Sequence, residues 1–188
     1  MNVFDFDGTI YDGDSETDFF FYCFSKYPRV RKHIFPCMGY GILYFLHIVD
    51  KTAFKQKFLS FVKYIDDIDG AVEKFWESHE KSIKKWYLEK KNPCDVIISA
   101  SPEFLLEPIC QKLGAECLMA TRSDKNTGIL DGVNCHGEEK VRRFYEKYPH
   151  GKIDEFYSDR YCDTPLAKLA KKAYIVKGEK LSPWKKYK

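Results

Sequence analysis

The chain has 188 residues, of which 44% are hydrophobic and 31% are charged. Such a composition supports one folded domain with a core of ordinary size, and it excludes disordered, collagen-like and small disulfide-stapled chains. The 31 basic and 28 acidic side chains leave a formal charge of only +3, so charge gives no argument for nucleic acid, and no nucleic-acid partner is expected.

Cysteine usage and the first residues indicate the compartment. The seven cysteines form no C-x-x-C pair and are odd in number, which favours reduced thiols over a disulfide framework or a zinc site. Aspartates from residue 5 onward interrupt the start of the chain, so we expect no signal peptide. The resulting prediction is a cytoplasmic protein.

The first expected element is a buried strand over residues 2–6, an apolar run that Asp7 and Gly8 end. From residue 15 to 88, aromatic and aliphatic residues recur at three- and four-residue spacing, which is typical of helices. Residues 95–99, reading DVIIS, predict a strand, and the helix after it ends at Gly114. The later pattern predicts strands at 116–120, 153–158 and 173–176 and helices at 138–148 and 165–172. At 128–134 it predicts a small hairpin or edge excursion.

Strands that alternate with helices predict an α/β fold with a doubly wound, mostly parallel, Rossmann-like sheet covered on both faces. This core would be formed by residues 1–14 and 90–188. The aromatic-rich helical stretch at 15–89 would be an insertion in it.

The string Asp5-Phe6-Asp7-Gly8-Thr9 is the most informative motif of the chain. It puts two carboxylates at the carboxyl end of the first strand, where open α/β sheets bind their ligands. One carboxylate can attack phosphorus, and a second that is kept partly protonated can give a proton to the leaving oxygen. The alternative is an acidic turn without a catalytic role.

Three later segments supply groups that suit a phosphate site. Ser99 ends the DVIIS strand, where a hydroxyl and nearby backbone amides can hold phosphate, although a helix cap is the simpler interpretation. Lys140 opens a helix and could neutralise a phosphoryl group, although alone it would be interpreted as a surface lysine. Asp159 and Asp163 follow the 153–158 strand and suit Mg²⁺, or they cap the next helix.

With these motifs in order, the sequence resembles the haloacid dehalogenase superfamily, and within it the phosphoserine-phosphatase-like branch, subfamily IB, whose C1-type helical cap is inserted just after the first motif. The resemblance implies that Asp5 is the nucleophile and that Asp7 is the general acid and then the general base. It also implies a phosphate site and a Mg²⁺ site. The phosphate site would use Ser99, Ala100, Lys140, Gly8 and Thr9; the Mg²⁺ site would use Asp5, the backbone carbonyl of Asp7 and Asp159, supported by Asp163.

The implied activity is hydrolysis of a small-molecule phosphomonoester, with Mg²⁺ as an obligatory cofactor because the acidic cluster would otherwise repel a phosphate dianion. Phosphoserine phosphatases and lipid head-group phosphatases acting on phosphatidylglycerophosphate-like substrates are both alternatives. Asp14 stands where the former carry a substrate-reading glutamate, and is the corresponding candidate here. A phosphotransferase or mutase, and a non-catalytic phosphate-binding or membrane-surface adaptor, also remain open.

Residues 34–49, IFPCMGYGILYFLHIV, carry no formal charge. As a helix the segment would be about 24 Å long, short of the roughly 30 Å hydrocarbon core, and Pro36, Gly39 and Gly41 disfavour one continuous helix. We favour a buried cap core, and the alternative is peripheral contact with an anionic membrane through residues 29–57. Basic residues on both sides would support that contact: Arg29, Arg31, Lys32, Lys51, Lys55 and Lys57.

Overall fold

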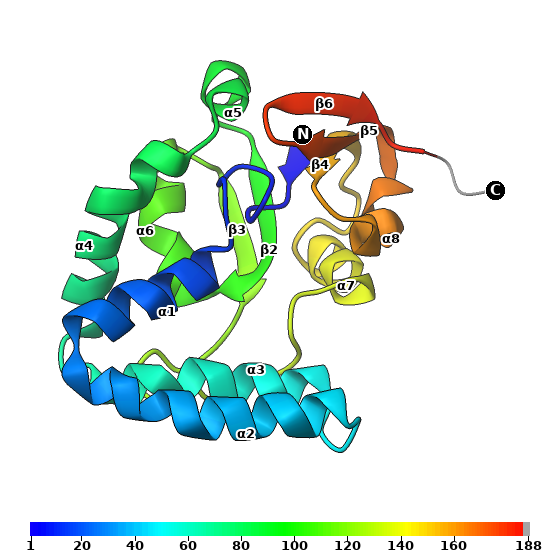
Figure 1. Ribbon diagram of the computed structural model, residues 1–188. Coiled ribbons are helices and arrows are strands. Elements are labelled where there is room, and N and C mark those ends of the chain that lie inside the picture. The colour runs from blue at the N-terminus through cyan, green and yellow to red at the C-terminus, as the bar shows by residue number, and fades with distance from the viewer. Residues whose placement is uncertain (186–188) are drawn as a thin grey trace.

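The computed structural model describes residues 1–185, except for the side chain of Lys51 (Figure 1). The strands are β1 (Asn2–Phe4), β2 (Val96–Pro102), β3 (Cys117–Thr121), β4 (Ile153–Ser158), β5 (Ala170–Lys177) and β6 (Lys180–Pro183). The α-helices are α1 (Ser15–Lys26), α2 (Ile34–Phe45), α3 (Lys51–Leu59), α4 (Ile68–His79), α5 (Lys85–Lys90), α6 (Glu103–Leu113), α7 (Glu138–Lys147) and α8 (Thr164–Ala167). Short 3-10 turns lie at Pro28–His33, Ser60–Tyr64, Glu80–Ser82 and Tyr161–Asp163.

The strands form one six-stranded sheet with the order β3-β2-β1-β4-β5-β6. Strands β1 to β5 are parallel, and β6 pairs antiparallel with β5 at the edge. Since β2 and β3 lie on one side of β1 and β4 and β5 on the other, the strand order reverses at β1. This confirms the predicted doubly wound sheet. In such sheets, ligands bind beyond the carboxyl ends of the strands at the reversal point.

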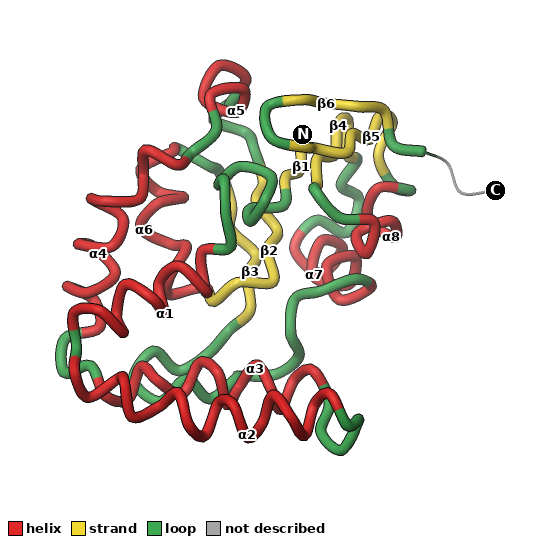
Figure 2. The backbone as a smooth tube through the Cα atoms, viewed as in Figure 1, coloured by secondary structure: helices red, strands yellow, loops and turns green. Residues whose placement is uncertain are grey.

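Helices cover both faces of the sheet, as buried parallel strands require (Figure 2). Successive side chains of a strand point to opposite faces. Phe4 of β1 belongs to a cluster that includes residues of α1, α4, α5 and α6. Val3 belongs to a second cluster with Phe144 of α7 and Leu166 of α8. Strand β1 is therefore packed into the core on both of its faces. This packing fixes the position of the residues that follow β1.

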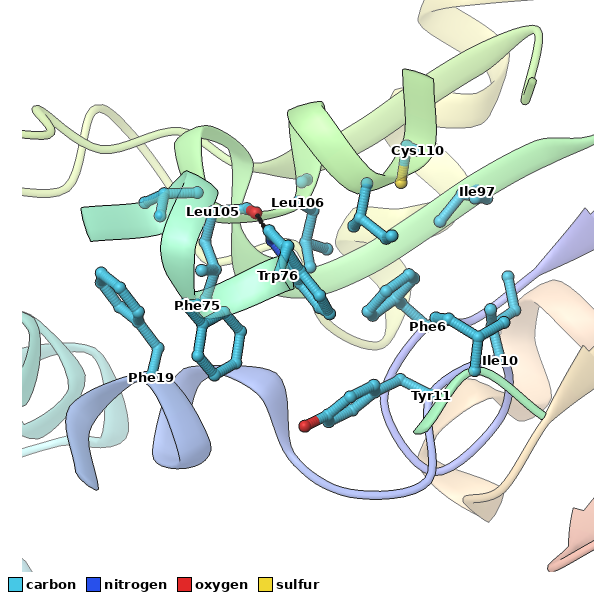
Figure 3. Close-up of a cluster of buried hydrophobic side chains, with 14 of the residues drawn as sticks. Phe6, Ile10, Tyr11, Phe19, Phe75, Trp76, Ile97, Leu105, Leu106 and Cys110 are labelled. Atoms are coloured by element: carbon cyan, nitrogen blue, oxygen red, sulfur yellow. Dashed lines mark hydrogen bonds between the residues drawn. The ribbon is translucent and has the colours of Figure 1, made fainter. Parts of the chain in front are cut away.

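Helices from the predicted insertion take part in the first cluster (Figure 3). The ring N–H of Trp76 on α4 donates to the carbonyl of Leu105 on α6 at 2.7 Å, and the same ring meets Phe6 edge to face. Helix α5, also inside 15–89, places Tyr87 edge to face against Phe4 of β1. The division into a core at 1–14 and 90–188 and a cap at 15–89 stays a prediction, and residues 186–188 of it lie outside the described part of the chain.

The favoured interpretation of residues 34–49 as a buried cap core is wrong. They form the continuous helix α2 and the turn after it, and no residue of α2 is buried. Helix α2 mainly contacts α3 and the turn at Pro28–His33. The rest of its surface is exposed to solvent. Pro36 was also expected to disfavour a continuous helix. It does not interrupt α2, because it lies in the first turn, where the backbone N–H groups make no hydrogen bond within the helix. The most exposed apolar side chains of this segment are Phe35, Met38, Ile42, Phe45 and Ile48, at 59–81%.

Two later predictions also needed correction. The helix expected at 165–172 ends at Ala167, because Ala170 already pairs with Ile153 of β4 and the ladder between the two strands continues to Ile175. Strand pairing thus overrides local helix preference. The small hairpin or edge excursion expected at 128–134 is limited to one antiparallel bridge, between Ser123 and Leu130, beside which the backbone N–H of Asp124 donates to the carbonyl of Ile129 at 2.8 Å. Within residues 1–185, no helix is long and apolar enough to cross a membrane.

Candidate active site

Asp5 lies directly after β1, at the reversal point of the sheet. Its backbone N–H donates to the carbonyl of Tyr157 on β4 at 2.9 Å, which continues the strand pairing by one step. Its carboxylate is 11% exposed and accepts a hydrogen bond from Lys140 Nζ at 2.8 Å. Burial raises the pKa of Asp5 to about 7, although the Lys140 ammonium acts in the opposite direction. The site therefore holds a carboxylate that is poorly solvated and paired with a cation.

Asp7 is held by two elements. One carboxylate oxygen accepts from the backbone N–H of Ser15, the first residue of α1, at 2.8 Å, and the other accepts from the hydroxyl of Ser101 on β2. Ser101 in turn donates its backbone N–H to Ser99 Oγ at 3.1 Å. Burial raises the pKa of Asp7, which the hydrogen bonds from Ser101 and Ser15 oppose. A fixed carboxyl group with a raised pKa suits proton transfer.

Gly8 makes the turn after the two aspartates possible. Its φ is +68°, and a Cβ at this position would overlap the carboxylate of Asp159. The ammonium group of the buried Lys84 donates a hydrogen bond to the carbonyl of Gly8 and so stabilises the loop. Asp159 thus reaches the loop only because residue 8 has no side chain.

Lys140 connects the two acidic motifs. It lies in the first turn of α7, is 2% exposed, and donates to Asp5 and to Asp163, each at 2.8 Å. Asp163 also accepts from Ser158 Oγ at 2.8 Å. Burial lowers the pKa of Lys140, but the two carboxylates outweigh burial and raise it above its ordinary value. The interpretation of Lys140 as a solvated surface lysine is therefore wrong.

Most of the predicted site residues line one cavity of ≈ 160 Å³. Gly8, Thr9 and Asp159 are not part of its wall; Thr9 is fully buried, and its hydroxyl has no hydrogen-bond partner within the described structure. Asp14 lines the cavity and also caps α1, since its side chain accepts from Thr17 N at 2.9 Å. The predicted residues in the wall are Asp5, Asp7, Asp14, Ser99, Ala100, Lys140 and Asp163.

Sequence reasoning gave no site role to seven residues of this wall, which are Glu16, Lys55, Ser101, Asn134, His136, Arg160 and Cys162. Ser101 received no role, although it lies two residues after Ser99 on the same strand. Glu16 and Lys55 form a salt bridge at 2.8 Å, and Lys55 also donates to the carbonyl of Ala100 at 2.6 Å. Lys55 was expected on the outer surface, but its side chain is only 12% exposed. No local pattern distinguishes it from the neighbouring lysines of α3.

The acidic residues fit a divalent cation. Asp159 Oδ1 and Asp163 Oδ1 are buried oxygens that accept no hydrogen bond from any described residue. Burial raises the pKa of Asp159, although Arg160, whose Nε lies 3.4 Å from Asp159 Oδ2, acts in the opposite direction. Within residues 1–185, three or more His, Cys, Asp or Glu side chains do not gather into a metal cluster. The predicted ligand set requires only two side-chain carboxylates, those of Asp5 and Asp159, with one backbone carbonyl.

Sequence relatives and solved structures match this chain over nearly its whole length. Protein CicA of Caulobacter vibrioides (strain NA1000 / CB15N) is 28% identical over 195 residues, which cover 93% of this chain and 85% of the relative. A crystal structure of a protein of unknown function from Bordetella pertussis Tohama I superposes with a TM-score of 0.73 at 18% identity, covering 92% of this chain and 87% of that one. A substrate-bound phosphoserine phosphatase complex superposes with a TM-score of 0.57 at 17% identity, covering 91% and 82%.

The family follows from a sequence match. The model of the haloacid dehalogenase-like hydrolase family matches residues 3–168, which include every residue of the predicted site. The likeness to phosphoserine phosphatases confirms the fold expected from the phosphoserine-phosphatase-like branch. This chain belongs to the haloacid dehalogenase-like hydrolase family.

Proposed function

We propose that the chain is a Mg²⁺-dependent phosphatase that hydrolyses a phosphomonoester through an aspartyl phosphate on Asp5. The observation that carries this proposal is the arrangement at the end of β1. There, the carboxylate of Asp5 is paired with the buried Lys140, and Asp7 lies in the wall of the same cavity. A nucleophile, a proton donor and a cation that can offset phosphate charge are the groups that phosphoryl transfer needs.

The two aspartates divide the chemistry between them. A carboxylate oxygen of Asp5 forms a bond to phosphorus while the bond from phosphorus to the alcohol oxygen breaks, and Asp7 gives its proton to that oxygen. A water molecule then gives its proton to Asp7 and attacks phosphorus, which releases inorganic phosphate and restores the carboxylate of Asp5. The raised pKa of Asp7, which burial causes, supports its part because it favours the protonated form that this step uses.

Residues around Asp5 would bind the phosphoryl group. Lys140 would bind its oxygens by charge, and Ser99 with the backbone at Ala100 would donate hydrogen bonds from the neighbouring strand end. The position of these three residues in the cavity wall supports these roles. The backbone at Gly8 and Thr9, expected to contribute as well, does not line this cavity.

Asp5, the backbone carbonyl of Asp7 and Asp159 would hold Mg²⁺, with Asp163 supporting from close by. The buried unpaired oxygens of Asp159 and Asp163 support this assignment. When bound, Mg²⁺ supplies positive charge that allows a phosphate dianion to approach several carboxylates.

An alanine at position 8 tests the place of Asp159. Gly8→Ala is expected to lower turnover by about tenfold or more, because the new Cβ would displace the Asp159 carboxylate. The matched control is Gly178→Ala, whose glycine has a similar φ of +58° and open space around the added Cβ. Both variants should lose about 1–2 kcal/mol of stability from the left-handed backbone alone. Equal activity of the two variants would contradict a role of Asp159 in the active site.

The substrate is proposed within the class of small phosphomonoesters. The exposed apolar surface of α2 favours a lipid head-group phosphatase over phosphoserine phosphatase, for which the chain offers the shorter Asp14 as the substrate-reading candidate. Intact Asp5, Asp7 and Lys140 count against a non-catalytic adaptor. We also propose a cytoplasmic location, which the seven free thiols support.

Peripheral contact with an anionic membrane through residues 29–57 follows from the same surface. The exposed side chains of α2 would enter the interface while Arg29, Arg31 and Lys32 meet acidic head groups. The protein should sediment with anionic vesicles at low salt, and Phe45→Ser with Ile42→Ser should weaken this binding. Leu88→Ser, exposed on α5, is the control. Absence of binding at low salt by the unaltered protein contradicts the contact.

Phosphate release tests the proposed activity. The unaltered protein is assayed with Mg²⁺ and then with EDTA, on an aryl phosphate, phosphoserine, sugar phosphates, nucleotides and phosphatidylglycerophosphate in mixed micelles. Release that requires Mg²⁺ supports the proposal, and addition of a second alcohol distinguishes hydrolysis from transfer by its products. No release from any of these compounds would contradict it.

A further inference from the structure

An apolar groove of ≈ 370 Å³ adjoins the cavity that contains Asp5. It lies between α1 and α3, and its apolar wall consists of four phenylalanines. Ligand sites are typically clefts of about 300–1,000 Å³ with a mostly apolar and aromatic lining and a few polar groups. The groove matches this description. Its phenylalanines are Phe20 and Phe21 of α1 and Phe54 and Phe58 of α3.

The groove and the cavity share part of their walls. Asp14, Glu16 and Lys55 line both. Lys55 is hydrogen-bonded to Glu16 and to the carbonyl of Ala100, so the shared wall joins α3 to α1 and to β2. A molecule with its phosphate beside Asp5 would therefore reach the phenylalanines by passing this polar wall.

Three of the four phenylalanines of the groove are only partly covered by the protein, whereas Phe20 is buried. Phe21 is 59% exposed, and Phe54 and Phe58 are partly exposed. Phe54 stacks on Tyr44 of α2 with 5.4 Å between ring centroids, so the apolar surface continues from the groove to the exposed surface of α2. Leaving such rings in water costs free energy that an apolar ligand would recover.

We propose that this groove binds an alkyl chain of the leaving alcohol, so that the substrates are amphiphilic phosphomonoesters with phosphate at one end and an apolar chain next to it. This inference rests on the proposed phosphatase activity and names its substrate class. The evidence for it is the position of the groove: the apolar walls begin where the polar wall of the phosphate cavity ends.

A series of monoalkyl phosphates tests the groove. Phosphate release is measured with Mg²⁺ for ethyl, butyl, hexyl and octyl phosphate below their micelle concentrations. The value of kcat/KM should rise about twofold per added methylene, as expected for a methylene that is covered on one side. The rise should appear mainly in KM, because the chain lies away from the reacting atoms.

Substitution of a groove residue should remove this dependence on chain length. Phe21→Ser is chosen because its ring is already exposed, so the fold should tolerate the change. It should lower the dependence on chain length, measured as the ratio of kcat/KM for octyl phosphate to kcat/KM for ethyl phosphate in the same protein. The matched control is Phe35→Ser, which makes the same change on α2 outside the groove and should keep the full dependence. A flat series in the unaltered protein, or an unchanged slope in Phe21→Ser, would overturn the inference.

Binding of phosphonates separates the groove from the chemistry. Octylphosphonate should bind more tightly than ethylphosphonate to the unaltered protein, and the difference should be lost in Phe21→Ser. This result would support the groove even where no phosphate is released, which would contradict only the proposed activity. Equal binding of the two phosphonates would overturn the groove, whatever the activity.

Discussion

Replacing Asp5 by asparagine should abolish phosphate release, by a factor on the order of 10⁴ or more, while the fold stays intact. Asparagine has nearly the same size and keeps an oxygen that can accept from Lys140, so packing around residue 5 should not change. It lacks the anionic oxygen that would attack phosphorus. The thermal unfolding midpoint and the far-ultraviolet circular dichroism spectrum should therefore stay close to those of the unaltered protein.

Asp12→Asn is the control for this substitution. Asp12 belongs to the same loop, but its side chain is 74% exposed and it does not line the cavity. The control should keep nearly full activity. If Asp5→Asn hydrolysed phosphomonoesters at an appreciable rate while folded, Asp5 would not be the nucleophile.

Replacing Lys140 by methionine should cost the most stability of the substitutions considered. The ammonium is buried between Asp5 and Asp163, and its removal leaves two buried carboxylates without their cation. Breaking a buried ion pair in this way typically costs about 3–5 kcal/mol, a large part of the free energy of unfolding of an ordinary domain. Phosphate release should also be lost. Chemical denaturation in EDTA measures the stability.

The loss of stability should depend on pH. Without Lys140, the pKa of Asp5 rises further, because the charge that lowers it is gone. A carboxyl group with a raised pKa in the folded state contributes stability that is present below its unfolded pKa of about 3.9 and is lost as pH rises towards the folded pKa. The deficit of Lys140→Met should thus be larger at pH 8 than at pH 5. Lys147→Met, exposed on α7, should stay within about 0.5 kcal/mol of the unaltered protein, and an equally small effect of Lys140→Met would contradict the buried pair.

The sequence predicted the parts of the site that follow strand ends. Asp5 and Asp159 each come directly after a segment whose pattern predicts a strand, and parallel strands end at the same edge of the sheet. The local pattern and the sheet topology therefore both predict that Asp5 and Asp159 lie at the same edge of the sheet. Lys140 could be predicted only through the family resemblance, since nothing local shows that the first turn of α7 is buried against Asp5.

The rest depends on contacts between distant segments. Lys55 enters the cavity because α3 packs close to the end of β2, an arrangement that its own sequence does not encode. The outward face of α2 was misjudged for the same reason. An apolar segment indicates that a surface will be covered, but only tertiary packing decides whether the chain itself covers it. Here α3 and the turn at Pro28–His33 cover only part of α2.

Trapping the phosphorylated enzyme tests the central claim most directly. The unaltered protein is mixed with an aryl phosphate and Mg²⁺, quenched within milliseconds and treated with borohydride, which reduces an acyl phosphate of aspartate to homoserine. We predict that mass spectrometry finds homoserine at residue 5, and that it is absent from Asp5→Asn and from protein without substrate. Rapid phosphate release with no reduced residue at position 5, or with homoserine at another aspartate, would contradict an aspartyl phosphate on Asp5.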